Sequence, residues 1–443
     1  MFQTIRNAFK IPELRKRIWF TLFMLVVFRF GAHIPVPFLD KSFMQTFLSG
    51  GGMDLFSLFD VFTGGAFSNA TVLAMGVSPY INASIIVQLL TVAIPALERL
   101  AKEGMEGRKK INKITRYMGI ALAFVQGAGL WVTLHNIGVE AQTTVFSNPG
   151  ALGFFTIVLT FTAGTAFIVW LGELITEKGL GNGVSMIIFA GIASGIPSGI
   201  KAIYQNYLAA GIGFKNILVV AMIVVFVIAA ITFVVLFNSA ERKIPVQYAK
   251  RVVGRKMYGG QSTNIPIKVV SGGVMPIIFA SSIMAFPQTV VRLATAGDLP
   301  TSGIGHILLS CLSAGYGPGW TDAVYSVLYF LLIIFFTYFY SAIQFNPIEL
   351  ANNMKKNGGY IPGYRPGKPT CDFIQAVTTR LNLVGALFLG IVAVLPIIAG
   401  AVFKIQGLQI GGTSLLIIEG VALETVKQVE SQLVMRHYKG FLE

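Results

Sequence analysis

The sequence predicts an all-α, polytopic membrane protein, and three observations support this class. Hydrophobic residues make up 54% of the 443 residues and charged residues only 12%, whereas soluble domains carry about 25% charged residues. The mean hydropathy is +0.71. Long apolar runs recur along the whole chain, each near the ~20 residues that a helix needs to cross the hydrocarbon core of a bilayer.

Ten apolar runs can be drawn, which predicts ten transmembrane helices. The first run resembles the core of a signal peptide, but it carries Arg29 and lacks a small-residue cleavage site, so we interpret it as a retained span. The short Gly179–Gly183 segment predicts that the fourth and fifth spans are antiparallel neighbours. The approximate ranges of the runs are 18–35, 74–96, 117–135, 151–173, 184–199, 216–238, 271–292, 323–344, 380–402 and 411–432.

A short repeat suggests that the ten helices form two halves. The stretch Gly76–Ser84 reads G-V-S-P-Y-I-N-A-S, and Gly273–Ser281 reads G-V-M-P-I-I-F-A-S. The copies fall in the second and seventh runs, so they cross the membrane in opposite directions, as in transporters and channels built from inverted repeats. Chance similarity between two apolar stretches is the alternative. The predicted divisions are an N-terminal segment at 1–17, halves of five spans at 18–205 and 206–432, and a tail at 433–443.

The distribution of basic residues predicts the orientation of the chain. There are 34 lysines and arginines against 19 acidic residues, a net charge of +15. Because loops rich in Lys and Arg stay in the cytoplasm, both termini are expected there. The two cysteines, Cys311 and Cys371, fall on opposite sides and predict no disulfide. Only five basic residues lie on the side opposite to the termini, namely Lys41, Lys201, Lys215, Arg292 and Lys404.

Two segments outside the spans carry apolar patterns. Residues 1–17 suit either a short amphipathic helix on the inner headgroups or a basic tail that only enforces orientation. Between the first two spans, apolar side chains recur at helical spacing over 55–62, and Gly64-Gly65 would end such a helix. Because about eight residues cannot span a bilayer, this predicts a half-helix buried in protein or lining a cavity. An interfacial helix on the outer surface is the alternative.

Two long, basic cytoplasmic loops are predicted at about 239–270 and 345–379. Long loops in a compact bundle are usually functional, and clustered cations suit an acidic protein or RNA phosphates. The alternative is that these cations only set the orientation of the helices. The basic residues of the first loop are Arg242, Lys243, Lys250, Arg251, Arg255, Lys256 and Lys268, and those of the second include Lys355, Lys356, Arg365 and Lys368.

No pattern for catalysis, metal binding or cofactor binding occurs in the sequence. The four histidines form neither an H-E-x-x-H motif nor an i,i+4 pair, and Gly363–Lys368 lacks the spacing of a phosphate loop. The sequence therefore predicts no enzyme, no metal and no cofactor. Arg29 and Glu419 are the only clear ionisable residues inside predicted spans. They give thin support to the alternative function, an inverted-repeat secondary transporter of a small solute.

Ordered motifs along the chain resemble the SecY family of bacterial protein-conducting channels. The resemblance implies a channel that passes unfolded secretory polypeptides across the plasma membrane and releases membrane segments laterally into lipid. The implied partners are SecE-like and SecG-like small membrane subunits, the SecA motor ATPase, the ribosome, signal sequences, unfolded polypeptides and the lipid bilayer. The resemblance begins near residue 13 and rests on Val27–Gly31, Ile34–Pro37, Gly64–Ala66, Pro79–Ile81, Ala83–Ile86, Gly107–Ile111, Trp170–Glu173, Gly181–Gly183, Tyr248–Lys250, Gln261–Thr263, Asn346–Pro347, Arg365–Gly367 and Gly411–Leu416.

The resemblance implies a hydrophobic pore ring and a plug. Spacing alone would class the aliphatic pairs four residues apart as ordinary helix packing. By resemblance, the pore ring falls on Val77, Ile81, Val184, Ile188, Ile278 and Ile417. The plug falls on about 55–69, with Leu55, Phe56, Leu58, Phe59, Val61, Phe62, Gly64, Gly65 and Phe67.

The resemblance also implies a lateral gate and a docking surface. The gate lies on the second and seventh spans, and its residues are Pro79, Ile85, Pro276, Ser281 and Ser282. Its two prolines are expected to be points of bending, because proline lacks a backbone donor. The basic loops dock the motor or the ribosome, with Arg242, Lys243 and Arg365 at positions that the family uses for partner contact.

Two residues depart from the family pattern. Pro245 replaces a β-branched aliphatic residue and is expected to redirect the tip of its loop. Glu419 replaces an apolar residue, and it lies two positions after Ile417, about 200° around the helix, so it should point away from the pore ring. We expect Glu419 either to stay protonated or to find a partner inside the bundle.

Overall fold

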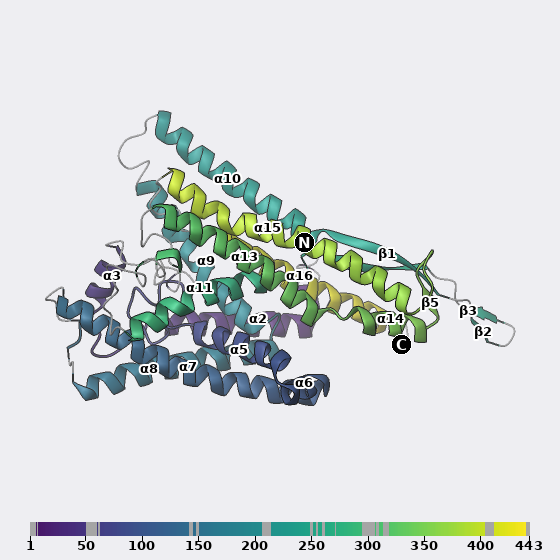
Figure 1. The fold of residues 1–443 in the computed structure, drawn as a ribbon. Helices are drawn as coiled ribbons and strands as arrows, with labels where there is room; N and C mark the ends of the chain where they lie inside the picture. Colours follow the sequence, from purple (N-terminus) through teal and green to yellow (C-terminus); the bar gives the residue numbers. More distant parts are fainter. Residues whose placement is uncertain are drawn as a thin grey trace. The chain divides into compact units, whose positions relative to one another are not determined.

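The computed structural model is built of long α-helices with a small sheet, which confirms the predicted helical class (Figure 1). A helix lies over each of the ten predicted apolar runs. Among the residues that the structure describes, six helices are long and apolar enough to cross a membrane, and α5 with α6 forms a seventh candidate bent by 101°. The described residues are 6, 8–49, 60, 63–140, 145–147, 150–205, 214–248, 251–253, 256–258, 262–270, 272–294, 306, 310–312, 319–403 and 412–439.

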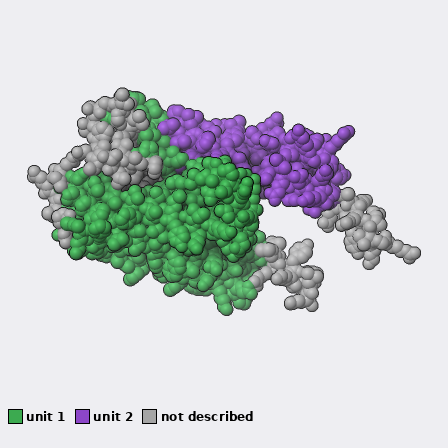
Figure 2. Space-filling model, turned by 60° about the horizontal axis from the view of Figure 1, so that its bottom comes forward, with its two compact units in different colours: residues 1–204, 281–325, 421–443 green, residues 205–280, 326–420 purple. Residues whose placement is uncertain are grey.

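The chain divides into two compact units (Figure 2). Unit 1 comprises residues 1–204, 281–325 and 421–443, and unit 2 comprises 205–280 and 326–420. Helices up to residue 204 are α2 (Pro12–Gly31), α3 (Lys41–Ser49), α5 (Ser78–Ala93), α6 (Pro95–Lys102), α7 (Met105–Glu140), α8 (Ala151–Lys178) and α9 (Gly183–Ile203). Later helices are α10 (Phe214–Ser239), α11 (Met275–Ala294), α13 (Gly319–Gln344), α14 (Pro347–Lys356), α15 (Lys368–Phe403) and α16 (Gly412–Lys439).

The two copies of the sequence repeat form the same local structure. Gly76 has φ +56° and Gly273 has φ +58°, a left-handed conformation that favours glycine. A helix begins two residues after each glycine, α5 at Ser78 and α11 at Met275. In the first copy the Ile81 amide donates to the Val77 carbonyl at 3.0 Å, and in the second the Ile278 amide donates to the Val274 carbonyl at 3.2 Å. The repeat is therefore a shared way of starting a helix.

The predicted bending at the repeat prolines is wrong. Pro79 and Pro276 are each the second residue of their helix, where the amide has no intrahelical partner and its absence costs nothing. The sharp bend in this region lies instead between α5 and α6, where Ile94 is extended (φ −107°, ψ 114°) and precedes Pro95. A residue before proline is disfavoured in the helical conformation, so this helix must break there.

Helix α8 is the element against which much of unit 1 packs. Its buried face includes Ile157, Phe161 and Ile168, at 0 to 1% exposure. A methyl group at Gly164 would overlap the carbonyl oxygen of Val72, and one at Gly172 would lie 3.1 Å from the side chain of Val184. The short turn after α8 makes α8 and α9 packed neighbours, as predicted.

The segment after α2 folds back on the bundle and adds a helix that the sequence did not predict, α3. An isolated bridge pairs Pro35 with Thr71. Asp40 precedes α3 and accepts hydrogen bonds from the Ser42 hydroxyl (2.6 Å) and amide (2.9 Å), which lower the pKa of its carboxyl. The apolar core beneath this segment contains Val36, Met44, Phe67, Ala70, Ala74, Leu130, Leu134, Val145, Phe146, Ile157 and Phe161.

The N-terminal segment buries part of its apolar surface in protein. Ala8 and Leu14 are 1% and 2% exposed and form a cluster with Leu180 and Val429. Leu180 also donates its amide to the Thr21 hydroxyl of α2 at 3.0 Å. The beginning of the chain is therefore attached to unit 1 over these described residues.

The two basic loops contain strands that the sequence did not predict. In the first, β1 (Glu241–Tyr248) pairs antiparallel with β4 (Ser262–Lys268), and β5 (Gly359–Tyr360) from the second loop adds to β1 at Gln247 and Tyr248. The separate strands β2 (Arg251–Val253) and β3 (Lys256–Tyr258) pair with each other. The sheet covers a core of Ile244, Val246, Ile267, Met354, Ile361 and Ile374.

Pro245 lies inside β1 and does not interrupt it. It stands opposite Asn264 of β4, at a point where β1 has no pairing with β5. Proline is tolerated on such an edge because no ladder hydrogen bond is lost on that side. The residues at the tip of this loop, where Pro245 was expected to act, lie outside the described residues.

The contact of α8 with the 63–76 segment gives a stability prediction. We expect Gly164→Ala to lower the midpoint of thermal unfolding of the purified protein, because its methyl group overlaps the Val72 carbonyl. Overpacking of this kind costs about 1–3 kcal/mol. The matched control is Gly195→Ala in α9, which meets nothing within 4 Å and should be neutral or stabilising. Equal midpoints for both variants would contradict the close contact.

Candidate functional site

Four of the six predicted pore-ring residues belong to unit 1. Val77 immediately precedes α5 and Ile81 lies one turn into it, while Val184 and Ile188 occupy the first two turns of α9. Val77 and Ile188 are 6% and 5% exposed, and Ile81 and Val184 are half-buried. Each pair is four residues apart and therefore shares one helix face.

The other two pore-ring residues belong to unit 2, and their helices approach each other closely. Ile278 in α11 is 8% exposed and Ile417 in α16 is 1% exposed. One turn before Ile278, Val274 lies so near Gly420 that a methyl group on the glycine would be 2.8 Å from the valine side chain. The small glycine surface thus brings the two helices together beside these isoleucines.

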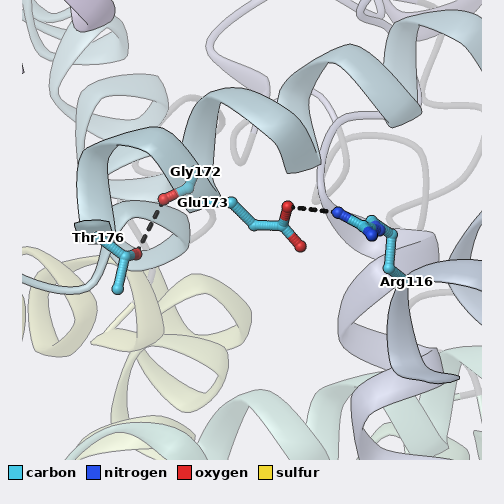
Figure 3. A network of polar contacts seen from close by, with 4 residues as sticks. All are labelled: Arg116, Gly172, Glu173 and Thr176. Carbon is cyan, nitrogen blue, oxygen red and sulfur yellow. Dashed lines mark hydrogen bonds and ion pairs between the residues drawn. The ribbon is translucent and has the colours of Figure 1, made fainter. Parts of the chain in front are cut away.

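A polar network fixes the start of α9, which carries Val184 and Ile188. The Thr176 hydroxyl donates to the Gly172 carbonyl at 2.8 Å (Figure 3). It also accepts the Gly183 amide at 2.8 Å. The Asn182 side chain caps the helix by accepting the Val184 amide at 3.1 Å. These contacts satisfy amides that have no intrahelical partner.

The same end of α8 is joined to α7 by an ion pair. Arg116 Nη1 lies 2.8 Å from Glu173 Oε2, with side-chain exposures of 39% and 38%. Glu173 is adjacent to Gly172 on α8, and its pair with Arg116 lies near the Thr176–Gly172 hydrogen bond (Figure 3). The same end of α8 therefore contacts α7 and, through Thr176, the start of α9. Partly exposed pairs contribute up to about 1 kcal/mol, so their main effect here is to fix the position of the helix end.

Part of the predicted plug can be placed. Phe67 is 2% exposed, and Gly64 and Gly65 have φ +67° and +84°. The Asp60 carboxylate accepts the Ser68 amide at 2.7 Å, while burial raises the pKa of this carboxyl. These residues form a turn, and the remaining plug residues, Leu55, Phe56, Leu58, Phe59, Val61 and Phe62, lie outside the described residues.

The predicted lateral-gate residues lie in the first turns of the two repeat helices. In α5, Pro79 is buried and Ile85 is 4% exposed. In α11, Pro276 is buried, and Ser281 and Ser282 are half-buried. None of these five side chains is fully exposed.

The predicted docking residues lie on the sheet and the loop before α15. Arg242 and Lys243 are exposed on β1, with the Lys243 ammonium 3.7 Å from the Glu241 carboxylate. Arg365 is exposed in the turn before α15. Arg251 and Lys256 lie in β2 and β3, and Lys250 and Arg255 fall outside the described residues.

Glu419 finds a partner within unit 2, which confirms one of the two expectations for it. Its side chain is 8% exposed. The side-chain amide of Asn238 in α10 donates a hydrogen bond from Nδ2 to Glu419 Oε2. Asn238 was not singled out from the sequence, because it lies 181 residues away at the end of an apolar run. Arg116 and Ser194 were not singled out either, because their contacts with Glu173 and Gly64 join residues far apart in the sequence.

The described part of the chain shows no cluster of metal-binding side chains. No group of three or more His, Cys, Asp or Glu side chains there is placed to hold a metal ion. The fold and these residues define a helical membrane protein built around apolar helix faces with a few partnered polar groups.

The chain belongs to the SecY family, whose family model matches residues 71–426. It is 46% identical to protein translocase subunit SecY of Streptomyces galbus and 45% identical to that of Halalkalibacterium halodurans, in each case over 100% of both chains. Solved structures share the fold. They include a protein-conducting channel (TM-score 0.61, 19% identity) and Sec61 in the canine ribosome-channel complex (TM-score 0.58, 18% identity), each over 97% of both chains.

The Asn238–Glu419 contact can be tested by a double-mutant cycle. We expect Asn238→Leu to destabilise the protein by about 1–3 kcal/mol, because it removes a donor from a buried carboxyl group. Adding Glu419→Leu should recover part of this loss, since both polar partners are then absent. Thermal unfolding measures both effects, with Asn353→Leu on the exposed face of α14 as a control. Additive losses in the double variant would rule out a direct interaction.

Proposed function

We propose that this chain is the pore-forming subunit of a protein-conducting channel in the bacterial plasma membrane. It passes unfolded polypeptides across the membrane and releases apolar segments laterally into lipid. The observation that carries this proposal is the match over the full chain length to relatives named protein translocase subunit SecY. The one-sided distribution of basic residues supports cytoplasmic termini.

The seal of the channel is formed by Val77, Ile81, Val184, Ile188, Ile278 and Ile417 in this proposal. Branched aliphatic side chains offer ions no hydrogen-bonding group, so a narrow ring of them excludes hydrated ions. The same side chains can spread around a polypeptide of any sequence, because apolar contact is not directional. Support comes from their burial within each unit and from the fixed start of α9.

The channel opens laterally between α5 and α11 in this proposal. An apolar signal helix that packs better against the parted helices than the closed ones shifts the population toward the open state. The plug at about 55–69 closes the resting pore. Support for a common role of α5 and α11 is the left-handed glycine and second-position proline that begin both helices.

Partners dock on the cytoplasmic sheet in this proposal, and they supply the directional work. Arg242, Lys243 and Arg365 offer exposed cations to ribosomal phosphates or to an acidic face of a SecA-like motor. The β1–β4 ladder holds the first two at one end of a rigid pair of strands. SecE-like and SecG-like subunits complete the assembly. The chain itself acts as a passive channel without a catalytic step.

Site-specific crosslinking tests the proposed function. A photoreactive residue at Ile188 or Ile278 should crosslink to a secretory polypeptide stalled during export, because both positions line the proposed pore. The control position is Val225 of α10, which is 66% exposed and should give no such crosslink. Saturable uptake of a small solute without crosslinks at either pore position would contradict a protein-conducting channel.

Ion leakage tests the pore ring separately. We expect the combined change Ile81→Ser, Ile188→Ser and Ile278→Ser to raise the resting conductance in planar bilayers, because hydroxyl groups hydrate the constriction. Ile228→Ser on the exposed face of α10 should leave the conductance unchanged. Unchanged conductance in the triple variant would remove the ring assignment while leaving the crosslinking result intact.

A further inference from the structure

Arg29 is a charged residue in the last turn of an apolar helix, and its contact is specific. Its Nη1 donates to the backbone carbonyl of Gly64 at 2.5 Å. Arg29 makes no ion pair with any of the acidic residues that the structure describes. A guanidinium group has five donors and stays charged, so a bond from it to a carbonyl is stronger than one between neutral groups.

Gly64 is held on its other side by α9. A methyl group there would overlap the Ser194 hydroxyl and lie 2.7 Å from the Gly191 carbonyl oxygen. With φ +67°, this position also favours glycine on conformational grounds. The Ser194 hydroxyl donates to the Gly191 carbonyl at 2.7 Å and lies 3.5 Å from the Gly64 carbonyl. Gly64 is thus held between α2 and α9.

The segment that contains Gly64, residues 63–71, is braced by its own hydrogen bonds, and we name it the plug-base turn. Within it, Asn69 Nδ2 donates to the Gly65 carbonyl at 2.6 Å, and the Thr71 hydroxyl donates to the Ala66 carbonyl at 2.9 Å. Beyond it, the Val72 amide donates to the Ile34 carbonyl at 3.0 Å. A turn that is rigid in itself moves as one body, so its position depends on its attachments, which are Gly64 to α2 and α9 at one end and the bridge of Thr71 with Pro35 at the other.

The plug-base turn is linked to two sets of proposed seal residues within unit 1. It includes the last residues of the proposed plug (55–69), and five residues after it Gly76 begins the helix start that carries Val77. On the other side it contacts α9 through Ser194, less than two turns from Ile188. A shift of this turn is therefore transmitted along the chain toward Val77 and through α9 toward Ile188.

We propose that Arg29 is a positioning residue for the closed channel, which holds the plug-base turn against α2 and α9 through the Gly64 carbonyl. This inference rests on the proposed function. It assigns to Arg29 a role in ion exclusion and in signal discrimination. Loss of the guanidinium group loosens the turn, so the resting channel conducts more ions and opens for polypeptides with weaker signal sequences.

The first test uses the complete translocase in planar bilayers and in export-competent vesicles. We expect Arg29→Gln to raise the resting ion conductance several-fold and to increase export of a substrate with a defective signal sequence relative to an intact one. Arg29→Lys keeps a charged donor and should restore most of the wild-type behaviour. The control is Arg15→Gln, which removes an exposed charge from the same helix. Wild-type conductance for a folded Arg29→Gln channel would overturn the proposal.

A second pair of variants tests the same attachment without changing a charge. Gly64→Ala and Gly65→Ala both place a side chain at positive φ, but only the first meets α9, since the nearest atom to the second lies 3.7 Å away. We expect Gly64→Ala to raise the conductance more than Gly65→Ala, and Ser194→Ala to exceed Ser198→Ala, whose hydroxyl bonds only Gly195. Equal effects within both pairs would overturn the attachment at α9.

These outcomes are distinct from failure of the proposed function. If the wild-type chain gives no crosslinks to an exported polypeptide, the channel itself is refuted. If wild-type crosslinks form and the Arg29 and Gly64 variants behave like their controls, only the positioning role is refuted.

Discussion

The close approach of backbone to backbone along α8 is the constraint on which much of unit 1 depends. Gly164 admits the carbonyl of Val72, and Gly172 admits the start of α9. A larger residue at either position would push away a segment that carries proposed pore residues. In a bilayer, where lipid is as apolar as the side chains, such packing at small residues is the main force between helices.

Three ionisable side chains on the helices of this apolar protein have defined partners, and these partners explain where such groups can be tolerated. Arg29 bonds a carbonyl, Glu419 receives a hydrogen bond from Asn238, and Arg116 pairs with Glu173. An unpaired charge at the centre of a membrane helix costs about 2.5–3.5 kcal/mol. The partners also tie helices together, so these contacts position the apolar residues that the proposed channel uses.

The cytoplasmic sheet shows how a basic loop becomes a surface of defined shape. Ile244 and Val246 face the core while Arg242 and Lys243 remain exposed. Alternation along β1 places Lys243 on the face opposite to Ile244 and Val246, whereas Arg242 lies on their face and is exposed near the start of the strand. The basic composition of the loop was evident from the sequence, but the strands were missed because their apolar positions are few. Their core is completed by Met354, Ile361 and Ile374, which lie more than a hundred residues after β1 in the sequence.

The sequence by itself determined the class, the places of the helices and the repeat, because hydrophobic runs and the Gly-Val-x-Pro spacing are local properties. The family resemblance named the pore, plug, gate and docking positions, and these assignments remain predictions. Only the tertiary structure decided which polar groups meet, and that the repeat prolines begin helices. Such pairings as Arg29 with Gly64 depend on how closely two backbones can approach, which depends on residues far apart in the chain.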